Sequence, residues 1–312
     1  MRIHETPALL LRGAIGLAAV ALVGCAPGGS TRTGRPVTQV GAFDVASYCT
    51  LAARTDLVEL TGSSAVVCDA TDEVGDDVVP SCHVLVADTA GAISDTSLEG
   101  AIAALRAADG RFVVLTADER LVLHDGRREL RELAAWAAAP SLDATGHRVV
   151  FVAPMEGADV AELGDPTRLV SLDLASGALS VIANDESATS PLFVPDGSAV
   201  LYVAAPEGVA SILRVPTSGG APTMLTNEGL VDMGQGFVPA YGLDHAWSGD
   251  TLVYTSPSRD GRSEIWALDT TTGDASRLGE GVHPMVTDTG EVIVTDASDG
   301  RCPVTLTLSV TP

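Results

Sequence analysis

The chain has 312 residues, with 41 acidic and 18 basic side chains and a formal net charge of −23 at pH 7. A surface this acidic repels nucleic acid phosphates and anionic lipid headgroups, so nucleic acid is not expected as a partner. Aromatic residues make up only 4% of the chain, which argues against a platform for stacking carbohydrates.

Residues 1–24 predict an export signal. Residues 13–24 form an apolar run that ends in Leu22-Val23-Gly24-Cys25. A short apolar core closed by small residues is typical of a secretory signal peptide and is too short to span a bilayer. The Leu-Val-Gly-Cys ending resembles the bacterial lipobox, which implies that Cys25 is lipidated and becomes the mature N-terminus. The alternative is an ordinary signal peptide in which Cys25 occurs by chance.

Residues 25–39 predict a flexible tether, because they are rich in Gly, Ser, Thr, Arg and Pro and have almost no large apolar side chains. With a lipid on Cys25, this tether predicts a protein held at the bacterial outer or inner membrane by its lipid anchor alone. The folded part, residues 40–312, is then expected in the periplasm or at the cell surface, as a monomer.

A small turn that contains glycine leads directly into a hydrophobic strand six times along the folded part. The glycines of these turns are Gly62, Gly110, Gly146, Gly197, Gly249 and Gly290. Units of about 40–45 residues with about four short strands each are typical of β-propellers. The pattern therefore predicts an all-β, six-bladed β-propeller. The alternative is a seven-bladed ring, in which residues 50–69 hide an additional degenerate unit.

The last unit of the pattern is one strand short, and the segment Val40–Tyr48 at the front is left over. We expect this segment to be the missing fourth strand, because closing the ring removes two open sheet edges. Cys49 would then lie beside Cys302, which predicts a disulfide between them. Cys68 ends one strand of the first unit and Cys82 begins the next, which predicts a second disulfide across a hairpin.

Two segments, Pro191–Gly197 and His245–Asp250, resemble the TolB-type propeller repeat, whose consensus runs Pro-x-Trp-Ser-Pro-Asp-Gly before the second strand. Residues 265–269, Gly273 and Leu278 fit the second half of that repeat. The resemblance covers about residues 140–296 and implies a TolB-like propeller in a bacterial lipoprotein. The amino-terminal domain of TolB is not expected, because the propeller pattern begins almost directly after the tether.

The longest connections of the pattern, residues 70–81, 154–166 and 227–244, fall on one face of the predicted propeller, where binding usually resides. Acidic residues of this face are the predicted binding residues: Asp72, Glu73, Asp76, Asp77, Asp232 and Asp244. Such a face suits a basic protein of the cell envelope. Calcium is a second candidate ligand for the first four carboxylates. The alternative is that the acidic loops serve solubility only.

A second group of candidate residues begins the first strands of the fifth and sixth units, near the mouth of the central channel. Asp244, His245 and His283 have the side chains to bind zinc or to act as acid and base. The alternative is that His245 replaces the proline of the repeat and His283 precedes its proline by chance.

No catalytic motif in the chain identifies a reaction. There is no Gly-x-Ser-x-Gly, no His-Glu-x-x-His and no phosphate-binding glycine loop. We therefore expect a protein-binding scaffold with no catalytic residue and no cofactor beyond the calcium or zinc considered above. The contrasting hypothesis is a small-molecule or metal-dependent enzyme, such as a lyase, lactonase or hydrolase, with its site at the channel mouth.

Overall fold

The computed structural model describes most of the folded part of the chain. The described residues are 45–52, 57–61, 64–74, 77–87, 93–155, 167–185, 187–205, 209–227, 230, 245–257, 262–287, 289–296 and 302–308. All of them belong to one compact unit, residues 36–312. The predicted signal peptide, the tether and Cys25 lie outside the described residues.

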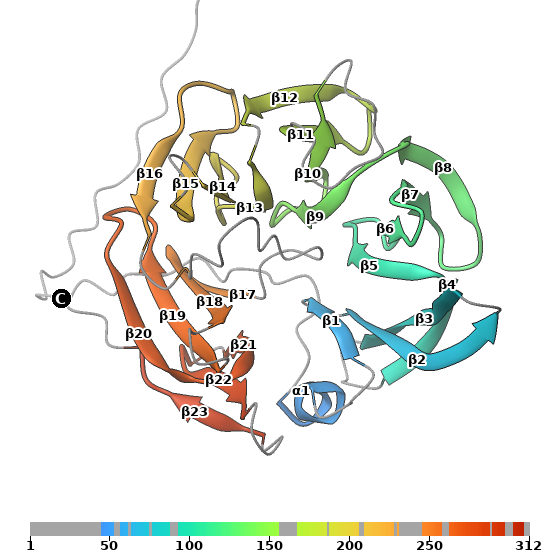
Figure 1. The fold of residues 1–312 in the computed structure, drawn as a ribbon, viewed down its shortest axis with the longest axis horizontal. Coiled ribbons are helices and arrows are strands. Elements are labelled where there is room, and N and C mark those ends of the chain that lie inside the picture. The colour runs from blue at the N-terminus through green and yellow to red at the C-terminus, as the bar shows by residue number, and fades with distance from the viewer. Residues whose placement is uncertain are drawn as a thin grey trace, which may run out of the picture. The chain divides into compact units, whose positions relative to one another are not determined.

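Six antiparallel sheets follow one another around a ring, which confirms the prediction of a six-bladed β-propeller (Figure 1). In each blade the strand that comes first in the chain lies toward the middle of the ring (Figure 1). The seven-bladed alternative is wrong, because the described residues between 50 and 69 belong to a helix and to the first two strands of blade 1.

The first three blades have four strands each. Blade 1 consists of β1 (Leu57–Thr61), β2 (Ser64–Val74), β3 (Asp77–Ala87) and β4 (Ile93–Glu99). Blade 2 consists of β5 (Ala101–Arg106), β6 (Phe112–Thr116), β7 (Leu121–His124) and β8 (Glu129–Ala134). Blade 3 consists of β9 (Ala138–Leu142), β10 (Arg148–Pro154), β11 (Thr167–Asp173) and β12 (Leu179–Asn184).

The next two blades repeat this layout, and blade 6 has three strands among the described residues. Blade 4 consists of β13 (Thr189–Phe193), β14 (Ala199–Ala204), β15 (Ser211–Pro216) and β16 (Thr223–Thr226). Blade 5 consists of β17 (His245–Ser248), β18 (Thr251–Pro257), β19 (Ser263–Asp269) and β20 (Ala275–Glu280). Blade 6 consists of β21 (Val282–Val286), β22 (Val292–Thr295) and β23 (Val304–Leu306).

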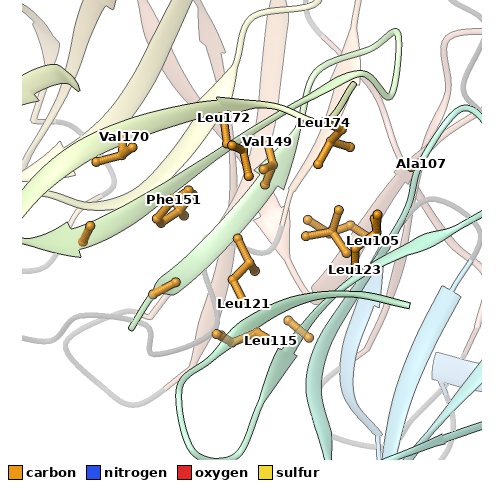
Figure 2. Close-up of a cluster of buried hydrophobic side chains, with 14 residues drawn as sticks. Leu105, Ala107, Leu115, Leu121, Leu123, Val149, Phe151, Val170, Leu172 and Leu174 are labelled. Atoms are coloured by element: carbon orange, nitrogen blue, oxygen red, sulfur yellow. The ribbon is translucent and has the colours of Figure 1, made fainter. Parts of the chain in front are cut away.

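The hydrophobic core lies between neighbouring blades. Figure 2 shows one cluster, in which Leu115 and Leu121 of blade 2 pack with Phe151 and Leu172 of blade 3. Because a blade is covered on both faces, its second strand reads as a continuous apolar run, and Val149–Ala153 of β10 is buried throughout. Outer strands such as β8 are largely exposed and carry charged residues instead.

The front segment does not form the closing strand that we expect over Val40–Tyr48. Residues Val45–Ala52 form the helix α1, while residues 40–44 lie outside the described part. This stretch lacks the polar and apolar alternation of a strand, and its Tyr48 and Leu51, three positions apart, fall on one helical face. Both side chains are buried against β2 and β3 of blade 1 and β22 of blade 6. A helix therefore fills the junction between the first and last blades.

A disulfide links the two sides of this junction, and two further cysteines lie opposite each other in a hairpin. Cys49 of α1 is bonded to Cys302, which directly precedes β23, so the expected covalent link between the two ends of the propeller is present although a helix carries it. Cys82 of β3 is disulfide-bonded, and the backbone of Cys68 in β2 lies directly opposite it. The register of this hairpin is the one that the predicted Cys68–Cys82 pair requires.

The predicted loop over residues 70–81 is mostly strand. β2 and β3 run on as a long hairpin in which Asp72 pairs with Val79, Glu73 with Val78 and Val74 with Asp77. The β-branched residues of this stretch favour extended structure, and a register shift between Asp69 and Asp72 marks a bulge. Only residues 75–76, at the tip, lie outside the described strands.

Candidate functional site

The candidate site is one of the two faces of the ring. Because neighbouring strands are antiparallel, the connections from second to third strand and those from blade to blade emerge on the same face. We call this surface the long-loop face; its connecting residues are 75–76, 100, 117–120, 135–137, 155–166, 185–188, 205–210, 227–244, 258–262, 281 and 296–303. The opposite surface, which carries the remaining turns, is called the turn face.

On the turn face several of the described carboxylates complete the turns themselves. Asp173, Asp196 and Asp269 each accept a backbone N–H two or three residues ahead, over 2.7–2.8 Å. The hydroxyl of Thr271 also donates to Asp269, and this bond with the backbone N–H groups holds the pKa of Asp269 below its usual range. These acidic residues therefore have a structural use that the turn geometry accounts for.

The predicted acidic binding residues of the long-loop face divide into two groups. Asp72, Glu73 and Asp77 lie on the β2–β3 hairpin, so the structure places them close together along paired strands. Asp76, Asp232 and Asp244 lie outside the described residues. The structure therefore brings three of the predicted residues together and does not test the others.

A tyrosine and an aspartate that the sequence did not single out organise the junction of blades 3 and 4 on this face. The Tyr202 hydroxyl, from β14, donates to Oδ2 of Asp185 over 3.1 Å. Oδ1 of Asp185 accepts the backbone N–H and the hydroxyl of Ser187, at 3.1 and 3.0 Å. The Ser187 oxygen in turn accepts the N–H of Ala205 at 3.1 Å. The Asp-x-Ser spacing is a turn signal that could have found part of this network.

The environment of Tyr202 keeps its hydroxyl protonated. Burial, and then the negative charge of Asp185 and the hydrogen bond to it, raise the pKa of Tyr202 well above its usual value. A tyrosine in this state acts as a hydrogen-bond donor and cannot serve as a general base near neutral pH. The Tyr202–Asp185 pair therefore positions the connection between two blades.

The two histidines predicted for the channel mouth lie on adjacent innermost strands. His245 begins β17 and is half-buried, and His283 is the second residue of β21, the neighbouring strand in the ring (Figure 1). The Tyr48 hydroxyl of α1 donates to the backbone carbonyl of His283. Asp244 lies outside the described residues, so the proposed three-residue group is not tested.

The innermost strands of three blades share a backbone distortion that the sequence did not predict. Ala139, Ser190 and His283 have φ angles of 47°, 49° and 53°, and each is followed by proline. In each blade the ladder between the first two strands shifts register near this residue. Left-handed backbone at a residue other than glycine is unfavourable, so the bulge is maintained by the packing around it.

Among the described residues, no group of three or more His, Cys, Asp or Glu side chains is arranged to hold a metal ion. In the same part of the chain, no helix has the length and apolarity needed to cross a membrane.

The fold is a six-bladed β-propeller. The structure is similar to that of TolB from Acinetobacter baumannii, with 15% identity and a TM-score of 0.52 over 82% of this chain; it spans 66% of that TolB chain. It is also similar to hydrazine synthase of Kuenenia stuttgartiensis, with 15% identity and a TM-score of 0.52 over 80% of this chain and 82% of the other.

A third similar structure is an oligogalacturonate lyase in complex with manganese, with 14% identity and a TM-score of 0.50 over 76% of each chain. No family profile matches the chain, and no curated protein matches its sequence. At these identities the likeness establishes the fold, which is shared by proteins of different functions.

Proposed function

We propose that this protein is a lipid-anchored propeller of the bacterial cell envelope that binds a basic protein partner through its long-loop face. The observation that carries the proposal is the one-sided charge of three segments in the sequence. The two longest connections of the long-loop face, at 155–166 and 227–244, and the hairpin segment 70–81 contain acidic residues and no lysine or arginine. On the turn face, acidic residues such as Asp173 and Asp269 are engaged by their own turns.

Acidic segments without basic residues suit long-range attraction of a partner of opposite charge. Electrostatic complementarity of this kind raises association rates and selects partners more than it adds affinity. An envelope scaffold needs an anchor, a spacer and a binding surface. In this proposal the anchor is a lipid on Cys25, the spacer is the tether over residues 25–39, and the binding surface is the acidic face of the propeller. The similarity of fold to TolB is compatible with this role.

Crosslinking in intact cells, followed by purification of the protein and mass spectrometry, tests the proposal. The test variant carries Asp72→Ala, Glu73→Ala, Asp76→Ala and Asp77→Ala. The control variant carries Asp250→Ala, Asp274→Ala and Glu291→Ala, which remove exposed carboxylates from the turn face. A basic partner that is captured by the wild type and the control but lost from the test variant supports the proposal. Capture of the same partner by all three proteins contradicts it.

The second candidate function is an enzyme with its site at the channel mouth. It is favoured by the placement of His245 and His283 on adjacent innermost strands and by the similarity in fold to an oligogalacturonate lyase. Metal analysis of protein purified without chelators tests it. Stoichiometric zinc or manganese that His245→Ala and His283→Ala each abolish would favour the enzyme over the scaffold.

A further inference from the structure

The hairpin of β2 and β3 extends beyond the rest of blade 1. β1 pairs with β2 only over Ser64–Val67, and β4 pairs with β3 only over His83–Ala87. Farther out, Asp69–Val74 and Asp77–Ser81 pair with each other and, within the described part of the chain, with no other strand. We call this two-stranded projection the acidic arm.

An arm of this kind leaves two rows of backbone N–H and C=O groups at its outer edges. A two-stranded hairpin is marginally stable by itself, and its open edges are templates for another strand. Cys82, which is disulfide-bonded, lies opposite Cys68 at the base of the arm. The arm is therefore a two-stranded hairpin whose edges carry no further strand within the described part of the chain.

The two edges of the arm differ in their capacity to accept a strand. Pro80 lies in the β3 half and has no N–H group, so that half offers an incomplete set of donors. The β2 half, Asp69–Val74, contains no proline and keeps every backbone donor and acceptor. The β2 edge is accordingly the better template.

The charge of the arm decides which strand can pair with it. The segment from Cys68 to Cys82 contains acidic residues and no lysine or arginine. Pairing of two copies of this chain along the arm would place like charges opposite one another, which destabilises a sheet. A strand with lysine or arginine side chains instead gains cross-strand attraction at the same positions.

We propose that the acidic arm is the docking element of the long-loop face, and that it accepts an extended, lysine- or arginine-rich segment of an envelope protein by strand addition along the β2 edge. This inference rests on the proposed scaffold function and names the part of the face and the chemistry of the partner. Main-chain hydrogen bonds supply affinity in this mode, and the carboxylates supply specificity.

A photo-crosslinking residue introduced at Thr71 of the arm, in the full chain in living cells, tests the proposal. Val209, which is exposed on the long-loop face in blade 4, serves as the reference position. We expect Thr71 to crosslink to one segment with an excess of Lys and Arg, identified by sequencing the joined peptides. A synthetic peptide of that segment is then the probe for binding to purified protein.

Two variants separate the backbone edge from the charge. The first replaces Asp69–Ser81 by Asn-Gly, a two-residue turn that can close the hairpin because Cys68 and Cys82 are directly paired. The second keeps the arm but carries Asp72→Asn, Glu73→Gln and Asp77→Asn. We expect the first to abolish peptide binding. We expect the second to weaken it at least about tenfold at low salt, with a smaller difference at ~1 M salt, where charges are screened beyond about 3 Å.

Hydrogen exchange distinguishes strand addition from a purely electrostatic contact, because only strand addition slows the exchange of backbone amides in the arm. Strand addition protects the amides of Asp69–Val74 when the peptide is bound, and this result also holds if the shortened variant fails to fold. Crosslinks at Val209 alone, or a bound peptide that leaves these amides unprotected, overturn the inference while the scaffold function stands. No partner at either position overturns both.

Discussion

The guanidinium of Arg148 pairs with Asp143 in its own blade and also reaches the next blade. Its Nε lies 3.2 Å from Oδ2 of Asp143, whose side chain is only 4% exposed. Its Nη2 donates to the carbonyl of Gly197 in blade 4 over 3.2 Å, and its Cζ lies 5.1 Å from the centre of the Phe193 ring. The Asp143–Arg148 ion pair thus orders a turn in blade 3, and Arg148 also contacts the corresponding turn of blade 4.

Replacing Asp143 by Asn should destabilise the protein and change its response to acid. Burial raises the pKa of Asp143, but hydrogen bonds from the Arg148 and His147 backbones, Thr145 and the Arg148 guanidinium outweigh it, and the pKa is lowered overall. The carboxylate therefore stabilises the fold above its unfolded pKa of about 4, and this contribution is lost as the pH falls through the folded value. We expect a loss of about 1–3 kcal/mol at pH 7 that shrinks toward pH 3, measured by urea unfolding.

The exposed pair of Asp109 and Arg111 provides the control for this prediction. Their side chains are 49% and 36% exposed, and surface pairs of this kind contribute less than about 1 kcal/mol. Asp109→Asn should therefore have a small effect. Equal losses for the two variants would mean that the burial of Asp143 and the contact of its partner Arg148 with blade 4 do not matter.

Removing the Cys49–Cys302 disulfide should lower the stability of the whole propeller. The bond links positions 253 residues apart and joins α1 to blade 6. Cross-links across long loops typically contribute about 2–5 kcal/mol. Cys49→Ser should therefore lower the melting temperature. Because the variant lacks this bond, adding a reductant should cause no further loss from its reduction. An unchanged melting temperature would show that the packing of α1 alone closes the ring.

Gly146 should tolerate no side chain, for two separate reasons. Its φ is +66°, and a Cβ there would lie 2.6 Å from the backbone nitrogen of Ala108 in blade 2. Gly290 has a similar φ of +82° but open space around it. Gly290→Ala should cost about 1 kcal/mol for the backbone conformation alone. Gly146→Ala should cost clearly more in thermal unfolding, and similar costs would refute the steric part of the argument.

Tyr202→Phe should remove one buried hydrogen bond and one source of sensitivity to alkali. Loss of the bond to Asp185 should cost about 1 kcal/mol at pH 7. The pKa of Tyr202 in the folded protein is raised above its ordinary value of 10.0. The protonated hydroxyl therefore stabilises the fold fully below pH 10, and this contribution is lost as the pH rises through the folded-state pKa. The variant should therefore lose less stability than the wild type above pH 10 in urea unfolding; identical pH profiles would contradict this.

Cys25→Ser should release the protein from the membrane fraction into the soluble periplasm. A lipid on Cys25 is the anchor that we propose from the Leu-Val-Gly-Cys motif, and residues 26–39 contain almost no large apolar side chains. Cell fractionation followed by immunoblotting measures the distribution. Unchanged membrane association of Cys25→Ser would exclude a lipid anchor at this position.

The way in which the ring closes could be predicted only in part from the sequence. The strand count and the cysteine positions indicated correctly that the two ends of the propeller are joined. They did not show that Val45–Ala52 is helical, because eight residues carry little periodicity and the packing partners of Tyr48 and Leu51 lie in two different blades. The acidic residues of 70–81 predict a solvated connecting loop, whereas the structure has a paired hairpin there.

The repeat of turn and strand was determined by the sequence alone. Gly110, Gly146, Gly197, Gly249 and Gly290 all have positive φ angles, as their turns demand, and each leads into a strand. These are local properties, because a glycine turn and an alternating strand depend on neighbours in the chain. The tertiary structure alone decided the Tyr202–Asp185 contact, the reach of Arg148 to the next blade and the projection of the acidic arm. The first two depend on how separate units pack, so residues far apart in the chain supply the partners. The arm is a local hairpin, and its extent beyond the other strands of blade 1 is seen only in the folded sheet.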